Sequence, residues 1–226
     1  MSNPFKNLSK KEWLLWIWAL VIIVISNLLS GKTDVLTLSA TVIGVTSLVF
    51  AAKGNVWAQV LMIVFSIIYG VISYRFRYWG EMVTYLGMTL PMAVWSTITW
   101  LKNPSKENGD EVAIQKLTCK HIAVLTFAGM IVTAVFYVIL RYFDTPNIIF
   151  STVSVTTSFF AASLTMLRSS YYALGYAAND IVLIVLWVLA AMDNTAYIPV
   201  AVNFVIFFFY DMYGFASWKK REAMQS

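Results

Sequence analysis

The segment from Cys119 to Tyr142 reads CKHIAVLTFAGMIVTAVFYVILRY, with no charged side chain between Lys120 and Arg141. An apolar helix of roughly 20 residues is long enough to cross the ~30 Å hydrocarbon core of a bilayer. Similar stretches precede it near residues 12–30, 34–52, 55–73 and 79–101, and others follow near 147–167, 171–192 and 196–218. The sequence therefore predicts an all-α polytopic membrane protein with about eight transmembrane helices.

Composition supports a membrane protein and excludes several chemistries. Hydrophobic residues make up 60% of the 226-residue chain and charged residues only 12%, about half the share usual in soluble domains. Mean hydropathy is +0.73. The single cysteine (Cys119) and single histidine (His121) cannot form an internal disulfide or a histidine-rich metal site. We therefore expect no metal, no cofactor and no catalytic residues.

The positions of lysine and arginine predict the orientation of the chain. With the N-terminus inside, twelve of these residues fall on inside segments and four, Lys32, Arg75, Arg77 and Arg141, fall outside. An excess of positive charge marks the cytoplasmic side, so both termini are expected there. The net charge of +5 then reflects topology, and no nucleic-acid partner is expected.

The ends of two spans indicate an internal repeat. Trp95 to Lys102 and Tyr213 to Lys220 show the same aromatic and basic pattern at an offset of 118 residues. We predict two parallel three-helix repeats, which in transporters enclose a substrate site near the membrane midplane. The predicted division is an N-terminal tail and extra helix (1–31), the first repeat (34–101), a cytoplasmic loop (102–118), a linker helix (119–142), the second repeat (147–218) and a cytoplasmic tail (219–226).

Polar and aromatic side chains recur at helical spacing in 55–73, 79–101, 171–192 and 196–218. Helix packing is one explanation of these polar and aromatic faces, since polar side chains form hydrogen bonds between helices. Such bonds contribute only about 0.6 kcal/mol each on average. Such a face also suits a planar, partly polar solute such as a nucleoside or vitamin. Aromatic rings attract a cationic ring, and amides and hydroxyls bond its polar groups.

Acidic and small residues give further expectations. An acid near the middle of a span costs at least ~2.5 kcal/mol, so Asp180 should face the bundle interior or a watery cavity. Glu81 lies near the outer end of 79–101, where we expect a solvated or interfacial charge. Spans 34–52 and 147–167 carry faces of small residues, which we interpret as packing walls because small residues let helices approach closely.

Two groups of motifs are distinctive. The first half contains Gly54-Asn55, Ser66-Ile-Ile-Tyr69-Gly70 and Arg77-Tyr-Trp-Gly-Glu-Met82. The second half contains Tyr171-Tyr-Ala-Leu-Gly-Tyr176-Ala-Ala-Asn179-Asp180 and Tyr210-Asp-Met-Tyr-Gly214. From about residue 35 to 220 the chain resembles PnuC-type nicotinamide riboside transporters. This resemblance implies a SWEET-like fold in the bacterial inner membrane, a homotrimer, and facilitated diffusion of nicotinamide riboside. A cytoplasmic riboside kinase would then trap the product.

The resemblance also implies the substrate-binding residues, carried over by position. These are Gln59, Ser66, Tyr69, Tyr85, Asn179, Asp180, Trp187, Asn203 and Tyr210. The chain departs from other branches at Ala93, where an asparagine would stand. Relatives carry thiamine, riboflavin or deoxynucleosides, so a sister transporter is one alternative and a non-transporting membrane scaffold is another.

Overall fold

The computed structural model describes residues 3–29, 35–75 and 79–225, and helices dominate this part of the chain. Short 3₁₀ turns lie at Pro4–Asn7 and Thr195–Tyr197. The α-helices are α1 (Lys10–Leu29), α2 (Val35–Ala52), α3 (Trp57–Arg75), α4 (Trp79–Thr84), α5 (Leu90–Lys102), α6 (Cys119–Tyr142), α7 (Ile148–Met166), α8 (Tyr172–Asp193) and α9 (Ile198–Met224). Seven helices among the described residues are long and apolar enough to cross a membrane. The predicted all-α membrane fold is confirmed.

The predicted span 79–101 is present, but it is not one regular helix. The segment η2 (Tyr85–Thr89), a π-helix, joins α4 to α5 without a break. Pro91 follows directly, near the start of α5. Because proline lacks the N–H that would bond the carbonyl four residues back, the wider π turn accommodates the missing bond. Such irregular turns are frequent at functional sites.

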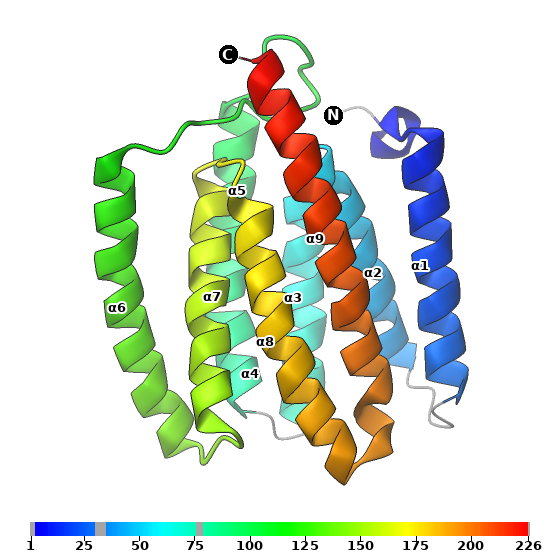
Figure 1. Cartoon of the computed structure of the whole chain (residues 1–226), viewed down its shortest axis with the longest axis vertical. Coiled ribbons are helices and arrows are strands. Elements are labelled where there is room, and N and C mark those ends of the chain that lie inside the picture. Colours follow the sequence, from blue (N-terminus) through cyan, green and yellow to red (C-terminus); the bar gives the residue numbers. More distant parts are fainter. Residues whose placement is uncertain (1–2, 30–34, 76–78, 226) are drawn as a thin grey trace.

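Among the described residues, six helical runs contact one another in a closed ring, and α1 and α6 lie at the two sides of the bundle (Figure 1). Around the ring α2 packs against α3, α3 against α5, α5 against α7, α7 against α8, α8 against α9, and α9 against α2. The outer helix α1 packs on α2 and α9, while α6 packs on α7 and α4. We call α2, α3 and the run from α4 to α5 the first three-helix unit, and α7, α8 and α9 the second. Each outer helix therefore covers one junction between the two units.

The turns α2–α3 and α7–α8 have the same backbone geometry. Gly54 and Arg168 both have a left-handed conformation, with φ of 66° and 56°. In each turn the amide of this residue bonds to the carbonyl three positions back, and the next amide bonds to the carbonyl five positions back. This arrangement satisfies carbonyls at a helix C-terminus. Every bonded residue of the second turn is numbered 114 higher than its counterpart in the first turn.

Two tryptophans close the end of the ring at which both chain termini lie (Figure 1). The indole N–H of Trp100 donates to the carbonyl of Thr165 at 2.9 Å, and that of Trp218 donates to the carbonyl of Ala51 at 2.8 Å. The two rings lie 5.6 Å apart and are 2% and 0% exposed. The last helix of each unit is thus bonded to the end of the first helix of the other unit.

Residues 103–118 cross this closed end. The amide of Val112 donates to the carbonyl of Gly54 at 2.9 Å, and the amide of Gln115 donates to the carbonyl of Arg168 at 3.0 Å. The loop therefore bonds to both left-handed turns. These bonds give it fixed positions on the first and second three-helix units.

Arg221 anchors the same loop from α9. Its guanidinium forms an ion pair with Glu111 at 2.7 Å and donates to the carbonyl of Val112 at 3.0 Å. Ser105 and Val112 are buried. The sequence predicted only a loop over residues 102–118, and these contacts place part of it in the protein interior.

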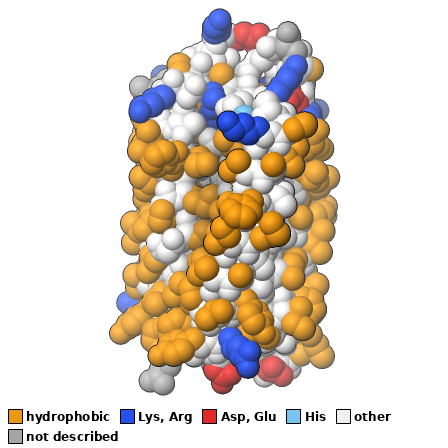
Figure 2. Space-filling model, turned by 90° about the vertical axis from the view of Figure 1, so that its left-hand side faces the viewer, with side chains coloured by type: hydrophobic (Ala, Val, Ile, Leu, Met, Phe, Trp, Pro, Cys, Tyr) orange, Lys and Arg blue, Asp and Glu red, His pale blue; other side chains and the backbone are white. Residues whose placement is uncertain are grey.

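The surface is apolar around the middle of the molecule. Figure 2 shows hydrophobic side chains over the central band of the face that carries α6, with charged side chains gathered at the two ends. On α6 the exposed large residues include Ile122, Val124, Phe127, Met130, Ile131, Val135 and Val138. An apolar band between charged ends is the surface that a bilayer requires.

Candidate functional site

The ring encloses a cavity of about 110 Å³. Its walls come mainly from α2, α3, α4, η2, α7, α8 and α9, with Leu140 of α6 and Thr145 also contributing, so both three-helix units take part. A buried water needs about 10–15 Å³ by this measure, so the cavity has room for roughly seven to eleven waters. That is space for a small organic solute.

Small residues line one side of the cavity. Ser151, Ser154 and Ser158 follow one face of α7, while Gly44 and Ser47 contribute from α2. We interpreted these faces as packing walls. Gly44 is indeed closely packed against Phe65 and Phe207, and the same faces also line the cavity, where their short side chains leave space.

Aromatic rings line much of the rest. Phe65 and Tyr85 lie on the side formed by the first unit, and Tyr69 packs behind them with ring centroids 5.5 Å and 4.4 Å away. Tyr172 and Tyr176 contribute from α8. Flat ring faces of this kind stack on aromatic solutes and attract cationic ones.

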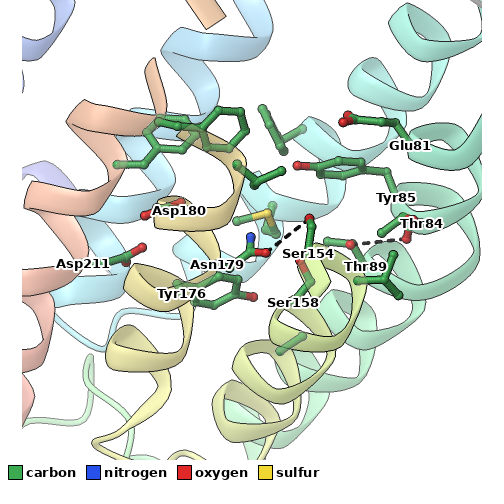
Figure 3. A pocket seen from close by; sticks show the side chains of 18 of the residues that line it. Glu81, Thr84, Tyr85, Thr89, Ser154, Ser158, Tyr176, Asn179, Asp180 and Asp211 are labelled. Carbon is green, nitrogen blue, oxygen red and sulfur yellow. Dashed lines mark hydrogen bonds between the residues drawn. The ribbon is translucent and has the colours of Figure 1, made fainter. Parts of the chain in front are cut away.

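Asn179 presents an oriented amide (Figure 3). The hydroxyls of Thr157 and Ser154 donate to its Oδ1 at 2.8 Å and 3.4 Å. With the oxygen engaged by two hydroxyl groups of α7, the amide nitrogen is left as the hydrogen-bond donor. Asn179 lines the cavity, so this donor is available to a bound solute.

Three acids, Glu81, Asp180 and Asp211, line the cavity, and no lysine, arginine or histidine does so among the described residues. Asp180 and Asp211 are 4% and 3% exposed and lie on the contacting helices α8 and α9. Glu81 is partly exposed at the outer end of its helix, where we expected a solvated or interfacial charge, and its side chain also lines the cavity. The cavity is acidic.

The structure brings four of the nine predicted site residues to the cavity wall: Gln59, Tyr85, Asn179 and Asp180. Gln59 is buried, and its side chain bonds to none of the described residues. Its amide therefore faces the cavity with its hydrogen-bonding capacity available.

The other five predicted residues lie outside this wall. Ser66 donates to the carbonyl of Met62 in its own helix, and the Tyr69 side chain lies beside that of Glu81. Trp187 packs against Tyr197 between α8 and α9. The remaining two, Asn203 and Tyr210, are buried on α9, where Asn203 donates to Thr41 of α2 at 3.2 Å.

Sequence reasoning left several lining residues out of the predicted site. Asp211, Tyr172 and Tyr176 lie on the polar stripes of their helices, as does Glu81. The serines of α7 also repeat at helical spacing. The helical periodicity that indicated the other candidates could therefore also have identified these residues.

A closed ring of membrane-spanning helices around a polar, aromatic, solute-sized cavity defines a polytopic membrane transporter. Residues 34–220 match the nicotinamide mononucleotide transporter family, and the chain belongs to that family. The predicted family and the predicted role in membrane transport are thus confirmed.

Individual relatives agree with this assignment. A nicotinamide riboside transporter PnuC from Neisseria mucosa is 26% identical over 186 residues, which cover 80% of this chain and 70% of the relative. The crystal structure of the vitamin B3 transporter PnuC matches with a TM-score of 0.83 and 22% identity, over 97% of this chain and 95% of the other. The second likeness shows the shared fold.

Proposed function

We propose that this transporter carries nicotinamide riboside by facilitated diffusion. The observation that supports this substrate best is the acidic cavity, with Glu81, Asp180 and Asp211 on its wall. Nicotinamide riboside contains a positively charged pyridinium ring, which carboxylates attract and aromatic faces stabilise. Asn179 and Gln59 supply hydrogen bonds for the carboxamide or ribose.

The same charges argue against the mononucleotide as the substrate. A phosphate monoester carries about −1.5 to −2 charges at pH 7, and proteins bind it with arginine, lysine or helix N-termini. The described lining has no basic side chain. Repulsion between the phosphate and the acids should therefore exclude nicotinamide mononucleotide from this cavity.

We infer that the two three-helix units are internal repeats that move against each other around the cavity. The matching turns at Gly54 and Arg168 and the exchanged tryptophan bonds support this relation. Because lysine and arginine concentrate near the termini, the end closed by Trp100 and Trp218 is the cytoplasmic end in this proposal. Residues 102–118 and both termini then lie in the cytoplasm.

The family resemblance supports three further parts of the proposal. The protein resides in the bacterial inner membrane, it forms a homotrimer, and a cytoplasmic riboside kinase makes uptake one-way by phosphorylating the product. Facilitated diffusion through the membrane supplies the kinase with the riboside, which carries no phosphate group.

Calorimetric titration of the purified protein tests the substrate. We expect nicotinamide riboside to bind at least about tenfold more tightly than nicotinamide mononucleotide, a difference of about 1.4 kcal/mol. Thiamine is the most informative competitor because it is also cationic, and riboflavin serves as an uncharged one. Equal or tighter binding of the mononucleotide would refute the charge argument, whereas tighter binding of thiamine would assign the chain to a sister substrate.

A further inference from the structure

Asp180 of α8 and Asp211 of α9 form a buried carboxyl pair on the cavity wall (Figure 3). The two carboxyl groups are close neighbours on the contacting helices α8 and α9. Two ionised carboxylates in one buried site repel each other, which favours retention of a proton by one of them. The described residues of the cavity wall offer no basic side chain to offset that repulsion.

The surroundings do not supply a cation in place of that proton. The titratable groups that face the pair are Tyr172 and Tyr176 on α8, with Tyr85 and Glu81 across the cavity. Among the described residues, no lysine, arginine or histidine lines the cavity. Arg221 stands ten residues after Asp211 on α9, about 15 Å along the helix, and pairs with Glu111.

One oxygen of the pair is available to a ligand. Asp180 Oδ2 has no hydrogen-bond partner among the described residues, although Asp180 is buried. An unpaired buried acceptor is costly unless something binds to it. Gln59, which is also buried on the cavity wall, makes no side-chain hydrogen bond within the described chain. Both groups indicate that a solute completes the site.

We propose that Asp180 and Asp211 share one proton in the empty transporter and release it when a cationic solute binds. The proton passes to solvent, the charge of the pair changes from −1 to −2, and the solute contributes +1 beside it. A nearby positive charge favours the ionised form of a carboxyl group. Binding of the cation and binding of the proton are then mutually exclusive. The identity of the cation, nicotinamide riboside, rests on the proposed function.

Linkage gives the sign and size of the effect. If one proton leaves for each cation bound, affinity increases by up to tenfold for each unit of pH over the range in which the pair is protonated. Binding is therefore tighter at higher pH. A pair that kept its proton on binding would give an affinity independent of pH.

Calorimetry in two buffers of different ionisation enthalpy measures the released protons directly. We expect the apparent enthalpy of nicotinamide riboside binding to differ between the buffers, and the pH slope to be lost in Asp211→Asn, whose amide replaces the shared proton. Glu81→Gln should keep the dependence of affinity on pH. Glu107→Gln, at an exposed position of the 103–118 loop, is the control for loss of a carboxyl group outside the cavity. Equal enthalpies in both buffers, or loss of the slope in Glu81→Gln alone, would overturn the proposal.

Infrared spectroscopy of the empty transporter separates this proposal from the substrate assignment. A protonated carboxyl band should be present in the wild type and absent in both Asp211→Asn and Asp180→Asn, so one variant suffices if the other does not fold. Absence of this band in the wild type overturns proton sharing. Presence of the band together with no binding of the riboside refutes the substrate while it supports the shared proton.

Discussion

Replacing Asn179 with alanine is the sharpest test of the cavity as the substrate site. The change removes the amide nitrogen that faces the cavity. It should leave the fold intact, since the Thr157 hydroxyl can donate instead to the carbonyl of Val153 or of Ser154, each 3.0 Å away. A lost hydrogen bond that leaves a solute group unpaired costs about 1–2 kcal/mol. Affinity for nicotinamide riboside should therefore fall roughly 5- to 30-fold, as measured by calorimetric titration.

Asn203→Ala is the matched control. Asn203 is equally buried but donates to Thr41 between α9 and α2, outside the cavity wall. This variant should lower the melting temperature and leave the affinity within about twofold, because it loses one internal hydrogen bond of about 1 kcal/mol. If Asn203→Ala weakened binding more than Asn179→Ala did, the substrate would lie elsewhere and the cavity assignment would be refuted.

Two predictions concern the closed end of the ring. Gly54→Ala should destabilise the protein by about 1–2 kcal/mol, because the left-handed conformation disfavours a side chain and the new Cβ would collide with the guanidinium of Arg221. A melting temperature equal to that of the wild type in detergent would contradict this. Trp218→Phe removes the bond to Ala51, so we expect a loss of about 1 kcal/mol in unfolding free energy. We also expect greater access of a thiol reagent to Tyr172→Cys, measured in a Cys119→Ser background because Cys119 is exposed. Unchanged labelling would show that this tryptophan does not close the cavity.

The sequence was sufficient for the membrane fold because the bilayer imposes a simple rule. A chain that crosses it needs about 20 apolar residues for each helix, and the described helices follow that pattern. This rule does not predict the π turn at Tyr85–Thr89. Length and hydropathy are the same for a regular and an irregular helix, and Pro91 alone does not determine which turn absorbs its missing N–H.

The site was harder to predict because a polar face on a membrane helix has two possible neighbours. Asn179 and Asn203 have the same chemistry, yet one lines the cavity and the other bonds to a neighbouring helix. Periodicity identifies the face that avoids lipid, but it cannot distinguish a cavity from a helix contact. The serines of α7 show the reverse ambiguity, since small residues suit both close packing and an open wall.

The contacts at the closed end set the scale of the opening step. Two indole bonds from Trp100 and Trp218 and two loop amides, of Val112 and Gln115, connect segments that must separate if the cavity opens there. At about 1 kcal/mol net for each bond, opening costs about 4 kcal/mol before new contacts form. A difference of a few kcal/mol leaves the open form as a minor state that a solute can select. We therefore expect these four bonds, together with the contacts of Arg221 with Glu111 and Val112, to keep this end closed in most molecules and to break when it opens.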